Sequence, residues 1–351
     1  MLISVVIPNY NYAEFVAQAI ESALALTGPT VEVIVVDDGS TDNSPTVIQR
    51  YADRITAIFQ QNEGQRVACN VGYAASSGDV VIFLDADDML DPTLGEALAQ
   101  IWRPGLSKVQ FQMKIVDRLG RPTGDVLPQF AFAPSAQQIR RWVQAAGAYP
   151  SPPGSGNAYA RTFLEQIFPL LGSEPFTDSY CLAAAPYLGD ILTVARPLVS
   201  YRVHGGNAGA LSDLDPGRFA AEVGRALWRF RYAREVAARA GISVPERVQH
   251  RSLRALAYRL ASLRLRPAQH PLPGDSLTKV LIDFGAGFLV DRSLPLRARA
   301  ALLAWAVLLT LSPLPIAERL VLWRFAPARR PQLLRRVLRK LAILRANAGP
   351  T

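Results

Sequence analysis

The sequence predicts an α/β fold: a mostly parallel sheet covered by helices on both faces, followed by a helical, basic C-terminal region. Three observations lead to this prediction. Short apolar runs alternate with segments of helical period over the first 84 residues. The runs are predominantly apolar and do not alternate with polar residues, as expected for strands buried on both faces. Beyond about residue 216, strand-like runs give way to long helical periodicities.

Four runs rich in β-branched residues predict the first strands: Ile3–Ile7, Val31–Val36, Ile55–Phe59 and Val80–Leu84. Helical periodicity fills the stretches between them: Ala13–Leu26, Thr46–Tyr51 and Ala68–Ala75. Two later segments, Lys108–Asp117 and Ile191–Val199, add strands. Pro150–Asn157 lies between these two and is rich in Pro, Gly and Ser, which predicts a flexible loop beside the functional site.

The C-terminal region begins with an amphipathic pattern that predicts a helix, with Phe219, Val223, Leu227, Phe230 and Ala237 on one face and arginines on the other. More helices are expected up to the end of the chain. We therefore expect two domains, residues 1–215 and residues 216–351.

The charge of the chain is concentrated at its C-terminal end. The net charge is +9, but residues 292–351 alone hold twelve Lys and Arg against one acid, Glu318, which leaves −2 for the first 291 residues. This asymmetry argues against nucleic acid as a partner and predicts an anionic surface that meets the tail. Cys69 and Cys181 lack metal or redox spacing, and no signal-peptide pattern follows Met1, so we expect reduced thiols and a cytoplasmic location.

Polar clusters follow each of the four predicted strands: Asn9–Asn11, Asp37–Asp42, Asn62–Arg66 and Asp85–Asp88. In parallel sheets, ligands bind at the carboxyl ends of the strands, so these clusters predict one shared site. The carboxylates of Asp37 and Asp38 can accept hydrogen bonds from a base or a ribose. The same segment also has the pattern of an ordinary helix-capping turn, and both interpretations stay open.

Asp85, Asp87 and Asp88 place three acids within four residues, directly after a buried strand. Such carboxylates repel one another unless a cation lies among them, and their oxygens suit Mg²⁺ or Mn²⁺. An ion there can bridge the two phosphates of a nucleotide diphosphate. The alternative is a solvated acidic turn.

These motifs, in this order and spacing, resemble the family 2 glycosyltransferases: Ser4–Asn11, Val33–Asp42, Asn62–Gln65, Asn70–Gly72, Gly78–Asp79 and Asp85–Asp88. The resemblance implies a GT-A type nucleotide-sugar fold and an inverting mechanism. It implies that Asp38 contacts the base, Pro8 lines the nucleoside pocket, Asp85 binds ribose or metal, and Asp87, with Asp88, holds the metal. Further donor-binding candidates lie in the same motifs: Asn9, Tyr10, Asp37, Asn62, Gly64 and Arg66.

The chain departs from the family at two positions. Many members have Arg where this chain has Cys69, and Arg66 either supplies that charge or is a solvated side chain. The family's catalytic base follows as Glu-Asp, and here Thr177 replaces the Glu, which makes Asp178 the predicted base. Asp190 is the competing candidate. A Tyr-Arg-x-His segment then implies that His204 completes the metal shell or contacts the diphosphate, whereas His250 and His270 are expected to be structural.

The C-terminal region has an uncharged stretch, Ala300–Ala317, which is interrupted by Pro313 and Pro315. This stretch is a short spanning segment, an interfacial hairpin or a core helix. Pro331–Arg345 then has leucines and valine on one face and Arg and Lys on the other, which predicts docking on anionic lipid. The alternative is a charged helix packed on the catalytic domain.

The sequence as a whole predicts a transferase that moves a sugar from a nucleotide-diphosphate donor, most often UDP in this family, to an acceptor hydroxyl on a glycan or a lipid. We expect it at the cytoplasmic face of a bacterial inner membrane, in surface-glycan synthesis. A nucleotidyltransferase is disfavoured because Pro8–Tyr12 lacks glycine and cations, and an oxidoreductase because G-x-G-x-x-G is absent there. A non-catalytic nucleotide-sugar binder is the remaining alternative.

Overall fold

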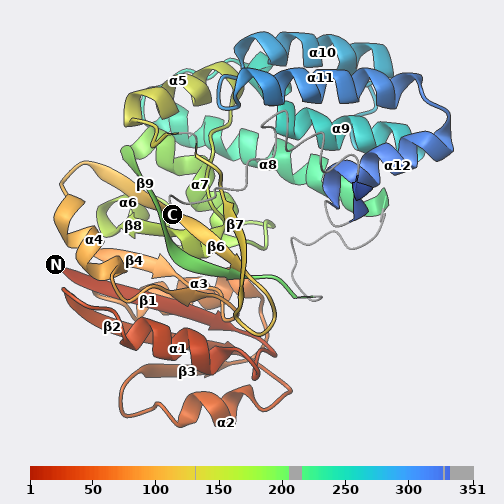
Figure 1. Cartoon of the computed structure of the whole chain (residues 1–351). Coiled ribbons are helices and arrows are strands. Elements are labelled where there is room, and N and C mark those ends of the chain that lie inside the picture. Colours follow the sequence, from red (N-terminus) through yellow and green to blue (C-terminus); the bar gives the residue numbers. More distant parts are fainter. Residues whose placement is uncertain (131, 205–215, 327–328, 333–351) are drawn as a thin grey trace, which may run out of the picture. The chain divides into compact units, whose positions relative to one another are not determined.

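The computed structural model of this chain describes residues 1–130, 132–204, 216–326 and 329–332. It divides into two compact units, which are described separately below. The first unit comprises Met1–Ala136 and Pro150–Val203, and the second comprises Gln137–Tyr149 and the chain from His204 onward. Figure 1 follows the chain through both units from red to blue.

The first unit is built on one mixed sheet, in the strand order β3-β2-β1-β4-β8-β6-β9-β5, with β7 paired to β6. The strands are β1 (Leu2–Asn9), β2 (Thr30–Asp38), β3 (Thr56–Gln60), β4 (Val80–Phe83), β5 (Met89–Leu90), β6 (Leu106–Val116), β7 (Pro122–Leu127), β8 (Asn157–Ala160) and β9 (Asp190–Arg202). The first four strands pair in parallel, and β6 pairs in parallel with β9. The predicted α/β class is therefore confirmed.

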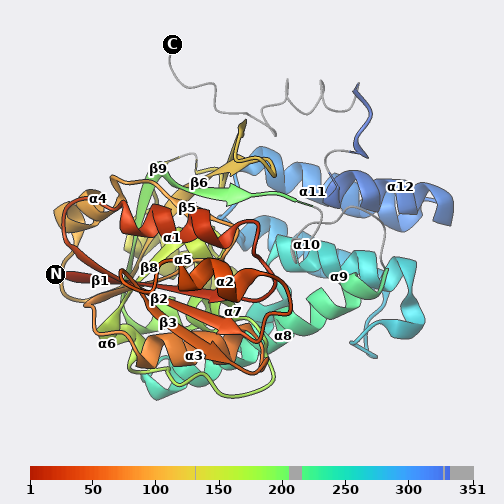
Figure 2. The same ribbon diagram turned by 90° about the horizontal axis from the view of Figure 1, so that it is seen from below.

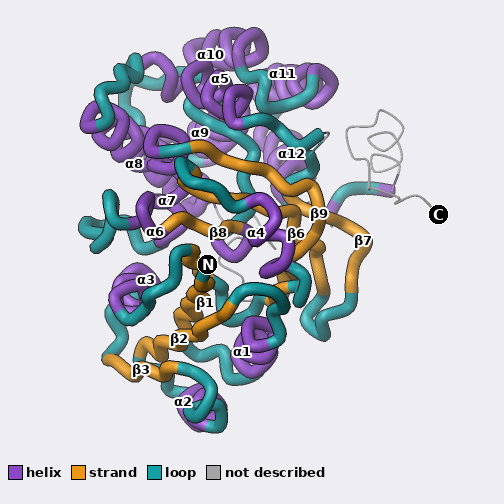
Figure 3. Tube along the Cα trace, turned by 90° about the vertical axis from the view of Figure 1, so that its left-hand side faces the viewer, coloured by secondary structure: helices purple, strands orange, loops and turns teal. Residues whose placement is uncertain are grey.

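Helices cover both faces of this sheet, as Figure 3 shows for α1 and α3 on opposite sides of β1 and β2. The helices of the unit are α1 (Val16–Leu24), α2 (Ser44–Gln49), α3 (Gln65–Ala74), α4 (Leu94–Ile101), α6 (Arg161–Leu164) and α7 (Thr177–Leu188). Successive strand residues point to opposite faces: Val5 belongs to the core that includes α1, while Val6 faces α3. A Cβ on Gly72 of α3 would lie 2.3 Å from Cγ1 of Val6, so glycine allows this close packing.

Strand β8 was not predicted from the sequence. It lies between β4 and β6 and runs antiparallel to both, directly after a short 3₁₀ turn, Gly154–Gly156. The segment Pro150–Asn157 was expected to be a flexible loop, but Pro152, Ser155, Gly156 and Asn157 are buried. Within this segment only Asn157 belongs to β8, and the residues before it form a largely buried turn that leads into the sheet.

The second unit is helical, and Figure 2 shows its helices α8 to α12 in cyan to blue. Its helices are α5 (Ala136–Ala146), α8 (Pro216–Arg239), α9 (Leu253–Leu265), α10 (Leu277–Val290), α11 (Leu296–Leu311) and α12 (Leu314–Phe325). The predicted helix from Phe219 onward is confirmed as α8. Its Phe219 joins a core with Leu256 and Leu260 of α9, Phe284 of α10 and Leu309 of α11.

The two histidines expected to be structural lie in a polar network of this unit. His270 is hydrogen-bonded at 3.0 Å to both Asp275 Oδ2 and Ser262 Oγ, and Asp275 also forms an ion pair with Arg259. His250 contacts the same guanidinium through Nδ1 at 3.0 Å. Burial of these side chains explains why their polar groups are paired with one another.

The apolar stretch Ala300–Ala317 forms most of α11 and the start of α12, and the chain turns at Pro313, as its prolines predicted. Within the described part of the chain, no helix is both long and apolar enough to cross a bilayer. The predicted basic helix Pro331–Arg345 lies, after residue 332, outside the described residues.

Candidate functional site

The polar clusters predicted at the strand ends are brought to one edge of the sheet. Parallel pairing sets Asn9 at the end of β1 beside Asp37 at the end of β2. Strand β4 lies on the other side of β1, and Leu84 just after it donates its N–H to Val6 O. The segments that begin at Asn9, Asp37 and Asp85 therefore leave the sheet as neighbours.

Asp37 ties the first two of these segments together. Its carboxylate accepts hydrogen bonds from Asn9 Nδ2 at 2.8 Å and from the backbone and hydroxyl of Ser40 at 2.9 and 2.8 Å. Asn11, in the left-handed region with φ of 59°, accepts from the backbone of Thr41 at 2.7 Å. Hydrogen bonds thus join the two loops to one another, and Asp37 is buried between them.

Asp38 holds the third loop instead of facing solvent. Its carboxylate accepts from Gln60 Nε2 at 2.7 Å and from the backbone N–H groups of Glu63 and Gly64 at 3.0 and 2.8 Å. Gly39 has a φ of +74°, and a Cβ there would lie 2.7 Å from the backbone N of Asn62. Both features bring the Asn62–Gly64 backbone close to the end of β2.

Around these buried acids, the other donor-binding candidates offer a more open surface. Asn62 and Tyr10 are exposed, and Pro8 and Gly64 are half-buried. An exposed aromatic ring and a proline at a strand end can stack on a planar base. Asp37 and Asp38 hold the loops through the hydrogen bonds given above, and the contact of Asp38 with the base stays a prediction.

Asp87 and Asp88 lie buried after β4, and Asp85 is half-buried beside them. Burial, the charge of Asp87 and that of Asp178 raise the pKa of Asp85 to about 7. Burial, the charge of Asp87 and that of Asp85 raise the pKa of Asp88 well above its usual value. Carboxylates crowded in this way are stabilised by a cation.

Two tyrosines that the sequence analysis missed face this acid cluster. Burial and the charges of Asp87, Asp85 and Asp88 raise the pKa of Tyr12 to about 12. Burial, followed by the charge of Asp88, also raises the pKa of Tyr201, which lies in β9. Both phenols are therefore protonated at neutral pH and can donate to carboxylate or phosphate oxygens. Tyr201 was signalled only by its place in the Tyr-Arg-x-His segment.

Gln65 and Ser155 position Asp85. Gln65 Nε2 donates to Asp85 Oδ1 at 3.0 Å, and the backbone N–H of Asp85 donates to Ser155 Oγ at 3.1 Å. Lys108 in turn holds the segment that contains Ser155, because its Nζ donates to Ser151 Oγ at 2.8 Å and to Asn157 Oδ1 at 2.7 Å. Burial lowers the pKa of Lys108 well below its usual value. No local pattern in the sequence distinguishes this lysine.

The predicted base, Asp178, lies in the first turn of α7 and reaches the same space. A Cβ built on Gly154 would lie 3.7 Å from Oδ2 of Asp85 and 3.8 Å from Cβ of Asp178. Asp85 and Asp178 therefore both border the space beside Gly154. Asp190, the competing candidate, instead begins β9 and pairs with Arg103 at 3.2 Å.

The two departures from the family pattern, Cys69 and Thr177, are neighbours in space. Burial raises the pKa of the Cys69 thiol to about 12, and the Thr177 hydroxyl beside it offsets part of this rise. Arg66, one turn before Cys69, donates to Leu170 O at 2.6 Å, and Asn70 also binds the Leu170 backbone. Arg66 therefore anchors the loop before α7.

The predicted metal ligands divide between the two units. Asp85 and Asp87 belong to the strand-end cluster, whereas His204 is the first residue of the second unit, so its metal contact stays a prediction. Across residues 1–130, 132–204, 216–326 and 329–332, no group of three or more His, Cys, Asp or Glu is arranged to hold an ion.

A divalent ion nevertheless fits the donor set. Asp88 Oδ2 is buried without a hydrogen-bond partner among the described residues, beside two further carboxylates. Mg²⁺ typically takes one or two protein carboxylates and completes its shell with substrate phosphates and water. The cluster therefore suits Mg²⁺ or Mn²⁺ carried by a diphosphate.

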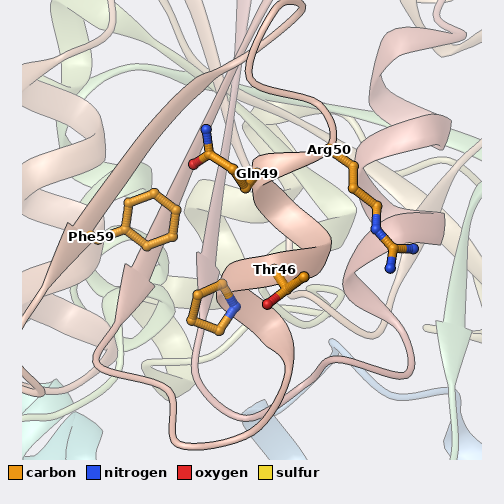
Figure 4. A pocket seen from close by; sticks show the side chains of 5 residues that line it. Thr46, Gln49, Arg50 and Phe59 are labelled. Atoms are coloured by element: carbon orange, nitrogen blue, oxygen red, sulfur yellow. The ribbon is translucent and has the colours of Figure 1, made fainter.

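Figure 4 shows a surface hollow near α2 that is lined by other residues than those described above. Its walls are Pro45, Thr46, Gln49, Arg50 and Phe59, none of which is a predicted site residue. The site is therefore defined by the strand-end side chains and not by this hollow.

Known proteins are similar to this region in sequence and in fold. The profile described as Glycosyl transferase family 2 matches residues 4–168. An uncharacterized glycosyltransferase of Nostoc sp. is 38% identical over 216 residues, covering 59% of this chain and 66% of the relative. Glycosyltransferase GlyG of Streptococcus pneumoniae is 35% identical over 103 residues, 28% of this chain and 34% of the relative.

The chain thus spans less than two thirds of the length of these curated relatives. Among solved structures, S. aureus TarS 1–349 in complex with UDP-GlcNAc is similar with a TM-score of 0.51 and 18% identity, over 88% of this chain and 90% of that one. Residues 4–168 thus match the glycosyl transferase family 2 profile, and the fold around them is of GT-A type, similar to that of TarS 1–349.

Proposed function

We propose that the chain is an inverting glycosyltransferase that moves a sugar from a nucleotide-diphosphate donor to an acceptor hydroxyl. One observation carries the proposal: Asp178 and Asp85 both border the space beside Gly154, so the proposed base lies close to a donor-binding candidate. An inverting transfer needs this arrangement, because the base takes the acceptor proton on the face opposite the departing diphosphate.

In this proposal the nucleoside lies over Pro8 and Tyr10, with Asn62 and Gly64 beside it. Asp37, Asp38 and Asn9 hold the loops that form that surface, through the hydrogen bonds described above. Arg66 acts on the donor through the loop it anchors at Leu170.

Asp85 and Asp87, with Asp88, would hold the divalent ion, and His204 is proposed to join them. The ion would supply positive charge against the diphosphate that leaves. Tyr12 and Tyr201 stay protonated beside the acids and can orient diphosphate oxygens by donating hydrogen bonds.

Asp178 is the proposed base. It lies in the first turn of α7, close to the Gly154 segment that borders Asp85. Asp178 then orients the acceptor hydroxyl and takes its proton as the new glycosidic bond forms.

We propose a glycan or lipid-linked acceptor and a place in bacterial surface-polysaccharide synthesis, at the cytoplasmic face of the inner membrane. The basic C-terminal region supports this location, because its twelve cations and single acid after residue 291 complement an anionic surface. On this division of roles, residues 1–215 are catalytic and residues 216–351 bind the membrane.

A non-catalytic nucleotide-sugar binder is the second candidate. Cys69 and Thr177 favour it, because both replace charged residues of the family beside the proposed base. A binder would hold the donor and leave the acceptor unactivated.

The test compares binding with turnover. A panel of nucleotide sugars, beginning with UDP-GlcNAc, is screened with and without Mn²⁺ for a rise in the melting temperature. We expect one donor to stabilise the protein only with metal and to be hydrolysed slowly without acceptor. Stabilisation with no hydrolysis or transfer would identify a binder, and no stabilisation by any donor would contradict both candidates.

A further inference from the structure

From Ala300 onward, helix α11 is apolar around its whole circumference. Between Ala300 and Leu311, Thr310 is the one polar residue. One face of the helix is accounted for, since Leu302, Ala306 and Leu309 are buried in the core of the helical unit. A helix whose opposite face meets water would normally have polar residues on that face.

The opposite face is instead apolar and exposed. Its residues recur every three or four positions and form a stripe along the helix, here called the α11 stripe: Leu296, Ala300, Ala304, Val307, Leu308 and Leu311. Leu296, Leu308 and Leu311 are 60%, 56% and 77% exposed. Leu314 and Ile316 continue the exposed surface through the turn into α12, at 45% and 48%. A continuous surface of this kind marks an interaction site.

The charges near the stripe show what kind of partner fits it. Arg292 and Arg297 are exposed at the start of α11, and Arg319 is exposed one turn after Ile316. Glu318 is the one exposed acid between Arg292 and Arg319. An apolar face with cations at both ends matches the boundary of an anionic bilayer, where acyl chains meet negatively charged headgroups.

We propose that the α11 stripe and the α11–α12 turn insert shallowly into the surface of an anionic membrane. This deepens the membrane location within the proposed function and does not depend on the donor chemistry. The 16 residues of α11 span about 24 Å, which is less than the hydrocarbon core of about 30 Å. Because its other face is packed in a protein core, the helix lies in the plane of the interface.

A second copy of the chain is the competing occupant. Two antiparallel stripes in a symmetric dimer would bring Arg297 of one copy toward Arg319 of the other. Like charges at both ends of the contact disfavour that pairing, whereas anionic headgroups neutralise them. The charges therefore favour lipid.

The test measures binding of the full chain to vesicles of phosphatidylcholine alone or mixed in equal parts with phosphatidylglycerol. The stripe variant carries Leu308→Ser and Leu311→Ser. The matched control carries Leu119→Ser and Leu171→Ser, since these leucines of the first unit are 67% and 75% exposed. Melting temperature and donor binding of each variant confirm that the fold is intact.

We expect wild type to bind the anionic vesicles and the stripe variant to partition at least about tenfold more weakly, with the control unchanged. Equal binding of wild type and stripe variant, or no binding of wild type, would overturn the proposal. So would a lipid-free dimer in sedimentation velocity that the stripe variant converts to a monomer. If wild type binds no donor, that result contradicts the proposed function but not the membrane inference, which rests on vesicle binding.

Discussion

The backbone N–H of Arg202, at the end of β9, donates a hydrogen bond of 2.9 Å to Oδ1 of Asp88, 114 residues earlier. The Arg202 side chain is buried and donates to Asp87 O, Arg118 O and Gln18 Oε1 at 2.7 to 2.8 Å. It also lies over the ring of Phe15. One arginine thus fixes the acid turn, α1 and the end of the last strand relative to one another.

Replacement of Arg202 by Met should lower the free energy of unfolding by about 3 kcal/mol or more, because the buried Asp87 carbonyl and two partly buried acceptors lose a charged donor. Chemical denaturation measures this change. The matched control is Arg118→Met. Arg118 pairs with Glu14 on the surface, with both side chains at least half exposed, so its loss should cost within about 1 kcal/mol. Equal losses in the two variants would contradict the role given to Arg202.

Asp87→Ala should abolish metal-dependent donor binding and turnover together while the melting temperature without ligand stays close to that of wild type. The reason is that Asp87 lies among crowded carboxylates which suit a divalent ion. Calorimetry with UDP-GlcNAc and Mn²⁺ measures the binding. Full activity of wild type in excess EDTA would count against a metal.

Asp178→Asn keeps the shape of the side chain but removes the proton acceptor. We expect kcat to fall by a factor on the order of 10² to 10⁴ while donor affinity changes little. The control is Asp190→Asn, which removes a carboxylate paired with Arg103 at the start of β9. The opposite result, with Asp190→Asn inactive and Asp178→Asn active, would transfer the role of base to Asp190.

Gly154→Val should place a branched side chain between Asp85 and Asp178. Gly154 has no positive φ, and the nearest atoms to an added Cβ lie at ordinary contact distance, so the fold should tolerate the change. We expect UDP binding to persist and UDP-sugar binding and turnover to fall. Gly224→Val on α8, where nothing lies within 4 Å of an added Cβ, controls for the substitution itself. An unchanged preference for UDP-sugar over UDP would mean that the sugar lies elsewhere.

Glu32 predicts a pH dependence of stability that is separate from the site. Burial alone would raise its pKa, but hydrogen bonds from Ser4, Ser77 and Gly78 outweigh this and lower the pKa below the ordinary 4.5. A depressed pKa in the folded state means that the contribution to stability is complete above about pH 5 and is lost as the pH falls through the folded-state pKa. Wild type should therefore be more stable than Glu32→Gln at neutral pH, and the difference should shrink below pH 4.5. A difference that stays constant down to pH 3 in urea denaturation would exclude this linkage.

Some of the architecture could be predicted because it depends on local sequence patterns, such as apolar runs and prolines. The runs Ile3–Ile7 and Val31–Val36 are long enough, and apolar enough, to require burial on both faces, which a parallel sheet provides. Such a sheet then places whatever follows its strands at one edge, so Asn9, Asp37 and Asp85 could be expected together. The breaks at Pro313 and Pro315 are equally local, because proline cannot continue the preceding helix.

Other parts of the site depend on contacts between residues far apart in the chain. Lys108 reads as an ordinary strand residue, and only the insertion of β8 beside β6 places it under the segment that positions Asp85. Cys69 and Thr177 read as two unrelated departures from a family pattern, but the fold packs α7 against α3, where a thiol and a hydroxyl meet.

The sequence by itself determined the α/β class, the strand-end acids and the uneven charge, since each follows from neighbouring residues and their periodicity. Only the tertiary structure decided that α5 joins the helical unit, that Asp178 and Asp85 both border the space beside Gly154, and that α11 buries one apolar face and exposes the other. These are decided by long-range packing: an apolar helix has the same sequence pattern on both faces, and which face finds a core depends on where its neighbours lie.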